Sequence, residues 1–436
     1  MPLRNCLSLS LRLGLGTLLL GSLTIRAGAA WQGSVGSEAG VELVRNPAAP
    51  AAGEITLEPM LLWHLGAEED ADDSEVFGRV TEIVVDDAGV SYLLDSQLHE
   101  IRVFSPTGEY LRSLGRNGEG PGEFVNGLHL FLLPENRLGV AQMMPSRIAV
   151  LGTGGEGFSD LHVPGVEGAA FSMIDGARAA AGHCVLSLMT PIAGPERSET
   201  RKRLIAVDPA GKLLATYSQL SEFHEGGGIV LRFGSGESED EDFMAQWDVD
   251  AAGRVYTAPF YDQYLIRVYA ADGTLSRLIR RDGERIKRSR EEIAEIEERQ
   301  AGIPESVPRP TISPYLRQIQ SFLTRPDGSL WVSTAAGSRE RRAGRVGPFD
   351  RFDAEGRFQQ RLWLAADYDP ERDEIIVTGD RLFVLKEAQM VSSSFSASSG
   401  NMSMQIRMGA RSEDEDEARG EAAPFSVISY RLPAGY

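Results

Sequence analysis

The stretch "VDDAGVSYLLDSQLHEIRVFSPTGEYLRSLGRNGE" (85–119) occurs a second time as "VDAAGRVYTAPFYDQYLIRVYAADGTLSRLIRRDGE" (249–284). With one inserted residue, glycines and tyrosines of the two copies coincide, namely Gly89 with Gly253, Tyr92 with Tyr256 and Gly108 with Gly273. In each copy, β-branched and aromatic runs are separated by Asp and Gly turns, which predicts a short antiparallel meander. The repetition indicates that the chain is built from similar β-sheets.

One strand of this unit recurs six times together with the turn that follows it. The copies are "IRVFSPTG" (101–108), "IAVLGTGG" (148–155), "IAVDPAG" (205–211), "IRVYAADG" (266–273), "DRFDAEG" (350–356) and "SVISYRLPAG" (426–435). Six meanders in one chain predict radial repetition, an arrangement that protects the edges of the strands from mispairing. We therefore expect an all-β fold, a six-bladed β-propeller over residues 54–436.

The two ends of the repeat region predict how the ring closes. The sixth copy ends at "LPAGY" (432–436) with no fourth strand after it, whereas "EITLEPMLLWHLG" (54–66) is a strand with no partner before it. This early segment resembles "EYLRSLG" (109–115), the fourth strand of the first repeat. We expect residues 54–66 to supply the outer strand of the last blade, so that an N-terminal strand closes the ring.

A glycine-rich segment, "GRNGEGPGEF" (115–124), follows the first repeat. A glycine-rich phosphate-binding loop is followed by a helix whose N-terminus receives the phosphate. Here the continuation "GEFVNGLHLFLL" (122–133) is typical of a strand. We interpret the glycines as a connection from the outer edge of one blade to the inner strand of the next.

The first repeat (85–119) and the glycine-rich segment (115–124) together resemble the bacterial six-bladed β-propeller family that is related to NHL-repeat propellers. The matching pattern is Gly115, Gly118, Gly120, Pro121, Gly122, Glu123 and Phe124. "IPESVPRPTISPYLRQIQSFLTRPDGSLWVS" (303–333) also resembles this family, and the resemblance covers most of residues 54–436. It implies a propeller fold and usually an exported location, and it supplies no catalytic residues.

The N-terminus has the pattern of a secretory signal peptide. Arg4 and Arg12 come before an apolar stretch (13–23), and small residues (27–30) follow it. The uncharged stretch is short for a membrane span of about 20 residues. We expect residues 1–30 to be a signal peptide and residues 31–53 a flexible N-terminal segment. The mature protein is then secreted or periplasmic, without a transmembrane segment.

Charge and cysteine content limit the partners that we expect. The formal net charge of −19 repels phosphate backbones, which argues against nucleic acid as a partner. Acidic runs at 68–75, 237–242 and 413–417 are typical of solvated loops, and none has the spaced oxygen ligands and glycine of a calcium loop. After signal cleavage Cys184 is the only cysteine, so we expect a buried, inert thiol and no internal disulfide.

The long connections of the predicted propeller fall on one face of the ring. With strands A to D numbered from the axis outward, the long segments are B–C or D–A connections, at 190–203, 219–243, 281–314, 335–348 and 387–424. Insertions on one face of a repeat array usually mark the side that functions. Within them we expect a short helical insertion between blades 4 and 5 (281–314), with Ile293 and Ile296 on one side, and a disordered loop in blade 6 (391–423).

We select candidate binding residues on this long-loop face. Exposed aromatic side chains beside polar groups suit sugar or peptide recognition, and the basic stretch after blade 4 would attract an anion. Asp95 has an alternative role in hydrogen bonding to its own turn, and the loop histidines an alternative as solvated side chains. The candidates are Asp95, His99, Arg116, Glu119, His224, Tyr261, Asp262, Tyr264, Arg281 and Arg285.

The chain contains no strong catalytic motif, and we name no catalytic residue. We expect a module that binds a small ligand or an extracellular or envelope protein through the long-loop face. The alternative is a metal-assisted hydrolase, lactonase or lyase, with a divalent metal such as calcium at the central channel. A third possibility is a structural element of an envelope assembly.

Overall fold

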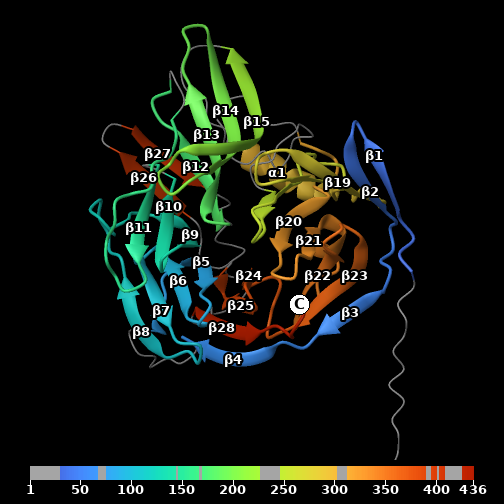
Figure 1. Cartoon of the computed structure of the whole chain (residues 1–436), viewed down its shortest axis with the longest axis horizontal. Helices are drawn as coiled ribbons and strands as arrows, with labels where there is room; N and C mark the ends of the chain where they lie inside the picture. Colours follow the sequence, from blue (N-terminus) through green and yellow to red (C-terminus); the bar gives the residue numbers. More distant parts are fainter. Residues whose placement is uncertain are drawn as a thin grey trace, which may run out of the picture.

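The computed structural model describes residues 30–66, 75–143, 146–165, 169–225, 246–301, 312–388, 394–399, 402–407 and 425–436. Six β-sheets surround a common centre in this part of the chain (Figure 1), which confirms the predicted six-bladed β-propeller. The expected signal peptide lies outside the described residues up to position 29. Among the residues described, no helix is long and apolar enough to cross a bilayer.

The first three blades follow the chain in order, with the first strand of each innermost. Blade 1 contains β5 (Val80–Val85), β6 (Ser91–Asp95), β7 (Glu100–Phe104) and β8 (Tyr110–Leu114). Blade 2 contains β9 (Gly127–Leu133), β10 (Arg137–Gln142) and β11 (Arg147–Gly152). Blade 3 contains β12 (Met173–Ala180), β13 (His183–Ile192), β14 (Arg197–Val207) and β15 (Leu213–Glu225).

The last three blades each take strands from the N-terminal part of the chain as well. Blade 4 contains β16 (Trp247–Val249), β17 (Val255–Thr257), β18 (Leu265–Tyr269) and β19 (Leu275–Arg281), then β2 (Val41–Asn46) and β1 (Ser34–Glu38). Blade 5 contains β20 (Ile319–Thr324), β21 (Leu330–Thr334), β22 (Arg345–Phe352), β23 (Phe358–Ala365) and β3 (Glu54–Leu57). Blade 6 contains β24 (Glu374–Thr378), β25 (Arg381–Lys386), β28 (Ser426–Arg431) and β4 (Met60–Leu65).

The six copies of the recurring strand are the third strands of the six blades. They correspond to β7, β11, β14, β18, β22 and β28. The turn that opens each long repeat is also the same in blades 1 and 4. Asp86 accepts two backbone N–H groups of its turn and the hydroxyl of Tyr92, and Asp250 does the same with Tyr256. The turn glycines have φ angles of +82° at Gly89 and +79° at Gly253.

Strands β1 to β4 (residues 34–65), which we call the N-terminal strap, run along the outside of blades 4, 5 and 6 (Figure 1). Strand β2 pairs in parallel with β19, β3 pairs in parallel with β23, and β4 pairs antiparallel with β28. The expected strand 54–66 is therefore two strands, and only β4 is the outer strand of blade 6. Residues 31–53, expected to be flexible, contain a hairpin because the outer edge of β19 offers it backbone partners.

The core is divided among the interfaces between neighbouring blades. Separate clusters of buried apolar side chains join blades 1 and 2, 2 and 3, 3 and 4, 4 and 5, and 5 and 6. A further cluster joins blade 6 to blade 1, and Trp63 of the strap packs there between Phe104 and Phe383. The first and last blades are thus held by a hydrophobic contact, which a side chain of the strap reinforces.

The glycine-rich segment (115–124) connects blades 1 and 2, and strand β9 rather than a helix follows it. Phe124 is fully buried, and a Cβ on Gly115 would lie 2.4 Å from its ring, so position 115 has no room for a side chain. Glu123 accepts hydrogen bonds from Arg116 Nε (2.6 Å) and from the backbone N–H of Gly120 (2.9 Å). These contacts close the loop on itself, as expected for a structural connection.

The inserted segments differ from the expectation in two places. The predicted helix is α1 (Arg290–Ala301), between blades 4 and 5, and the side chain of its Ile296 is buried. However, 190–203 and the start of 219–243 are not loops, because β13, β14 and β15 continue outward as paired strands beyond the ring (Figure 1). In the expected disordered loop of blade 6, β26 (Ser394–Ser399) pairs with β27 (Met402–Arg407), and the remainder of 391–423 lies outside the described residues. A second short helix, α2 (Ala335–Ser338), lies in blade 5.

Candidate functional site

A cavity of about 730 Å³ occupies the centre of the ring. Every blade contributes its innermost strand to the wall, because the first strand of each meander faces the axis. At one end the wall includes residues of the long-loop face between β21 and β22 and between β23 and β24. The volume is in the range of ordinary small-ligand sites. We call this space the channel cavity.

Charged side chains from blades 1, 3 and 4 meet in the channel cavity. Arg178 of β12 lies between two carboxylates, with its Nη1 3.6 Å from Glu82 of β5 and its Nε 4.0 Å from Asp248 of β16. The Asp248 Oδ2 also accepts the backbone N–H (2.8 Å) and the hydroxyl (2.9 Å) of Thr324. These contacts join the innermost strands of four blades by polar groups in an otherwise apolar ring.

His129 of β9 extends this cluster to blade 2. Its Nε2 lies 2.9 Å from the carbonyl oxygen of Asp175, and its Nδ1 lies 3.4 Å from Glu82 Oε2. A carbonyl oxygen only accepts, so Nε2 must carry a hydrogen. Glu82 therefore lies beside both the His129 ring and the Arg178 guanidinium.

The surroundings of Glu82 and Asp248 shift the pKa values of the two carboxyl groups in opposite directions. Burial by itself would raise the pKa of Glu82, but Arg178 and the hydrogen bond with His129 hold that pKa below its ordinary value. Burial raises the pKa of Asp248, and Arg178 and the Thr324 hydrogen bonds offset this only in part. Glu82 is thus the group that carries a negative charge, and Asp248 is the group that retains its proton more readily.

The side chains of the channel do not fit a divalent metal. Within the described ranges, no three His, Cys, Asp or Glu side chains converge into a group that could hold one. The position between Glu82 and Asp248 is taken by the guanidinium of Arg178. A positive charge of the protein itself thus lies in the channel, where the enzymatic alternative would place a divalent metal.

Replacing Asp248 with asparagine is expected to stabilise the fold at neutral pH by about 1 kcal/mol. A carboxyl group whose pKa is raised in the folded state stabilises it at low pH, and this contribution is lost as pH rises through the raised pKa. Asparagine keeps an acceptor for Thr324 and cannot ionise. Urea denaturation should show the gain at neutral pH and its disappearance toward pH 3.8, the ordinary Asp value. Equal effects at both pH values, or the same gain in Asp87→Asn on an exposed turn, would contradict this.

The channel cavity is rich in arginine although the protein is acidic. Its charged residues are Arg178, Arg325, Arg341, Arg345, Glu82 and Asp248. Arg325 donates to the carbonyl oxygens of Gly379 (2.8 Å) and Tyr436 (3.3 Å). Neither Arg341 nor Arg345 has a carboxylate partner among the described residues. Positive charge therefore exceeds negative charge in the channel cavity.

Two of the candidates predicted from the sequence, Asp95 and His99, lie at the end of the first blade and make local hydrogen bonds. Asp95 is fully buried. His99 has a positive φ of 56°, and its Nδ1 accepts the backbone N–H of Asn126 at 3.3 Å. Both side chains therefore have structural contacts. The Asp95 carboxylate accepts four backbone N–H groups, from Gly78, Arg79, Gln97 and Leu98.

Three further candidates lie away from the channel cavity. Arg116 is exposed and pairs with Glu123 in the connection between blades 1 and 2, where Glu119 is exposed as well. His224 lies on β15 in the outward extension of blade 3, with Nε2 3.4 Å from the hydroxyl of Thr200. The structure therefore does not bring these side chains together with those of blade 4.

Tyr261, Asp262 and Arg285 lie together at the junction of blades 4 and 5. Asp262 accepts a hydrogen bond from Arg285 (2.7 Å), and the Arg285 guanidinium lies 3.7 Å from the ring centre of Tyr315. Tyr261 was expected to be an exposed aromatic residue, but it is fully buried and its hydroxyl accepts a hydrogen bond from Arg288. Only Asp262 and Arg285 of this group reach the surface.

Tyr264 and Arg281 meet in the interior between the same two blades. Tyr264 is only 6 % exposed, which corrects the expectation of a rim aromatic residue. Its hydroxyl donates to Asp350 (3.0 Å), and Arg281 pairs with the same carboxylate. Burial raises the pKa of Tyr264 well above its ordinary value, and the nearby Asp350 adds to the shift. This cluster holds the two blades together.

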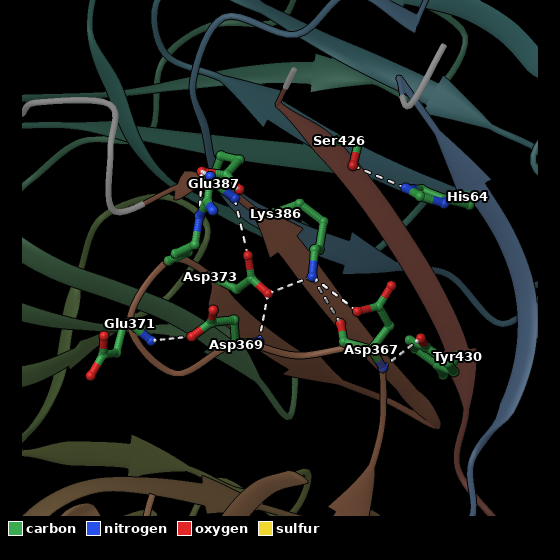
Figure 2. A network of polar contacts seen from close by, with 10 residues as sticks. His64, Asp367, Asp369, Glu371, Asp373, Lys386, Glu387, Ser426 and Tyr430 are labelled. Atoms are coloured by element: carbon green, nitrogen blue, oxygen red, sulfur yellow. Dashed lines mark hydrogen bonds and ion pairs between the residues drawn. The ribbon is translucent and has the colours of Figure 1, made fainter. Parts of the chain in front are cut away.

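A second polar network lies in blade 6 (Figure 2). Lys386 Nζ contacts the carboxylates of Asp373 (2.7 Å) and Asp367 (3.1 Å), and Asp373 is 1 % exposed. Asp373 also accepts the backbone N–H groups of Asp369 and Glu387. Lys386 is the cation at the centre of this network, and Glu387 beside it pairs with Arg372. We interpret this network as structural.

The residues of the channel cavity were missed because they lie far apart in the sequence. Glu82, Arg178 and Asp248 line the cavity and His129 lies beside it, and each belongs to the first strand of its repeat. The segments that contain them are "VTEIVV", "GLHLFLL", "MIDGARAA" and "WDV". An ionisable residue in an apolar strand that faces the axis is the signal that could have found them.

No family model matches this chain, and no curated protein does. Among solved structures, it is similar to a member of the DUF4221 family from Bacteroides vulgatus, with 10% identity over 86% of this chain and 98% of that chain and a TM-score of 0.46. It is also similar to the calcium-binding protein regucalcin from Agrobacterium tumefaciens (11% identity, 87% and 96%, TM-score 0.38). A further similar structure is virginiamycin B lyase from Staphylococcus aureus (12% identity, 85% and 99%, TM-score 0.36). At these values the similarity says nothing about function, and the relation to NHL-repeat propellers remains a prediction.

Proposed function

We propose that the protein is a binding module that takes up a small organic anion in its channel cavity, from the long-loop face. The observation that carries this proposal is the reversal of charge inside the ring. The whole chain has 44 basic and 63 acidic residues, whereas the wall of the channel cavity has four arginines and two acidic residues. The raised pKa of Asp248 reduces the negative charge there further.

A concave space with both apolar and charged groups in its wall suits an organic anion rather than a simple ion. Phe131, Phe322 and Phe349 are among the apolar residues of the wall, together with the indole of Trp247. In such an environment, charge-assisted contacts with guanidinium groups are stronger than in water. The ligand that fits has an apolar body and at least one acidic group.

The location and the partners of the protein are part of the same proposal. The pattern of residues 1–30 supports export, so the ligand would be met in the periplasm or outside the cell. Binding of an extracellular or envelope protein to the long-loop face remains a prediction. We favour binding over catalysis, since the residues of the channel cavity do not fit the metal that the enzymatic alternative requires.

The proposal predicts that the protein distinguishes an aromatic anion from its neutral analogue. The anion 8-anilinonaphthalene-1-sulfonate should bind at least about tenfold more tightly than uncharged N-phenyl-1-naphthylamine, because only the former contacts the arginines. Arg178→Gln and Arg345→Gln should each weaken binding of the anion about tenfold and leave the neutral compound unaffected. Fluorescence titration measures both affinities.

Arg116→Gln provides the matched control. It removes the same charge from an exposed residue at the connection between blades 1 and 2. Its affinity for the anion should equal that of the wild type, and rising salt should weaken binding of the anion only. Equal affinities for the charged and neutral compounds, or a loss in Arg116→Gln as large as in Arg178→Gln, would overturn the channel cavity as the binding site.

A further inference from the structure

A second cavity lies between helix α1 and blade 5. It has a volume of about 500 Å³, and we call it the outer cavity. Ser338 and Arg341 also line the channel cavity, so the two cavities adjoin at these residues. The outer cavity thus borders the channel cavity on the side of helix α1. The outer cavity is lined by Glu292, Leu316, Gln320, Ser338, Arg339 and Arg341.

Helix α1 is firmly fixed over this cavity. Ser289 and Glu292 form a capping box, in which the Ser289 hydroxyl accepts the Glu292 N–H (3.1 Å) and the Glu292 carboxylate accepts the Ser289 N–H (2.7 Å). The same carboxylate accepts a hydrogen bond from Arg339 of blade 5 at 2.6 Å. Ile296 on the helix is 2% exposed. The cavity is therefore formed before any ligand arrives.

The charges of the outer cavity leave one cation uncompensated. Burial would raise the pKa of Glu292, but its bond with the Ser289 N–H and the contact with Arg339 hold the pKa below its ordinary value. Glu292 is thus ionised and neutralises Arg339. Arg341 is exposed and has no carboxylate partner among the described residues, and it borders both cavities.

Building on the proposed function, we propose that the ligand is an elongated organic dianion with one acidic group in each cavity. A compact monoanion beside Arg178 and Arg345 would leave Arg341 and the amide of Gln320 unused. A chain with an acidic group at both ends places one beside Arg178 and Arg345 and the other beside Arg341. Leu316 provides apolar contact for the chain in the outer cavity.

The test compares α,ω-dicarboxylates with monocarboxylates of the same chain length, over a series of increasing length. Each compound displaces 8-anilinonaphthalene-1-sulfonate from the full-length protein. Long dicarboxylates should bind at least about tenfold more tightly than monocarboxylates of equal length, because the second acidic group gains a charge-assisted contact. Short dicarboxylates cannot reach the outer cavity and should show no such gain.

Leu316→Trp fills the outer cavity without altering the channel cavity. It should abolish the advantage of the long dicarboxylates and leave the affinities of the monocarboxylates and of the fluorescent anion unchanged. If that variant does not fold, Gln320→Leu, which removes the amide, should reduce the same advantage. Equal binding of mono- and dicarboxylates at every length, with the fluorescent anion still bound in the channel cavity, would overturn the dianion and leave the proposed function standing. Absence of arginine-dependent binding of the fluorescent anion itself would overturn both.

Discussion

Replacing Lys386 with methionine is expected to lower the free energy of unfolding by about 3 kcal/mol. Lys386 is the cation of the network in blade 6 (Figure 2), and its partner Asp373 is 1 % exposed. Methionine has a similar length but no charge, so it would leave a buried carboxylate without a counterion. The loss of one partner of a buried ion pair is more damaging than the loss of both.

Two further variants distinguish the loss of the buried counterion from the effect of any Lys→Met substitution. Lys386→Met combined with Asp373→Asn should recover most of the lost stability, since no buried charge then remains. Lys212→Met, at an exposed position in the connection before β15, should change stability by less than about 0.5 kcal/mol. Urea denaturation gives the three values, and a Lys386→Met protein as stable as the Lys212→Met control would contradict a structural role for the network.

The same network should contribute less to the free energy of unfolding at high pH. Burial would lower the pKa of Lys386, but the hydrogen bonds with Asp373 and Asp367 and their charges raise it above 10.5, the ordinary value. A lysine whose pKa is raised stabilises the fold fully below the unfolded value, and this contribution is lost as pH rises through the raised pKa. The difference between the wild type and Lys386→Met should therefore shrink above pH 10.5.

Replacing Asn46 with alanine is expected to lower the free energy of unfolding by about 3 kcal/mol. Asn46 is 1 % exposed at the end of β2 in the N-terminal strap, and its side chain joins the strap to blades 4 and 5. Alanine would leave a buried N–H group and two buried carbonyl groups without partners. The four bonds of the amide involve Trp31 Nε1 (2.9 Å), the Phe358 N–H (2.7 Å), the Arg280 carbonyl (3.1 Å) and the Gly356 carbonyl (3.0 Å).

Limited proteolysis gives this prediction a readout that is specific to the strap. In Asn46→Ala, cleavage within residues 34–65 should become faster than cleavage within the blades, because the strap loses its anchor before the ring unfolds. Asn117→Ala, at an exposed position of the glycine-rich connection, is the matched control and should leave both rates unchanged. Uniform acceleration over the whole chain would show that Asn46 does not act on the strap in particular.

The number of blades could be predicted because each blade repeats the same local signals. The Asp and Gly turns, with Tyr92 and Tyr256 at equivalent positions, depend on contacts within a few residues. The third strand of each repeat combines a buried apolar run, such as "LIAV" in β14 and "VF" in β7, with the turn that follows it. Such patterns are set by local geometry, and no knowledge of distant contacts is needed to recognise them.

The strap could not be predicted in the same way. Residues 34–38 are exposed and polar, so their sequence has no clear strand periodicity. Strands β2 and β3 pair in parallel with β19 and β23, which lie more than two hundred positions later in the chain. Their pairing depends on an outer edge that exists only after blades 4 and 5 have folded. Strand β4 was easier to predict, because the sequence of the last repeat lacks a fourth strand.

The candidate site was harder to predict than the fold. The polar groups of rim candidates such as Asp95 and Tyr264 are already used within the protein. The Asp95 carboxylate accepts backbone N–H groups, and the Tyr264 hydroxyl donates to Asp350. The channel residues Glu82, Arg178 and Asp248 are single residues whose proximity depends on the register of three blades around the axis. Only the closed ring shows that they share one cavity.

In the channel cluster and in the network of blade 6, a side chain of the protein provides the cation. Arg178 lies between Glu82 and Asp248, and Lys386 lies between Asp367 and Asp373. In the network of blade 6, one lysine faces two carboxylates, so negative charge exceeds positive charge there. The channel cavity differs from it, because its arginines outnumber its carboxylates and it has room for a ligand.

A crystal structure of the protein soaked with 4-bromobenzenesulfonate, with the bromine located by anomalous scattering, tests the central claim most directly. We expect a bromine peak inside the channel cavity, with the sulfonate against Arg178 or Arg345, and loss of that peak in crystals of the Arg178→Gln, Arg345→Gln double variant. Bromine found only on the outer surfaces of the blades, or a peak in the channel cavity that the double variant retains, would contradict it.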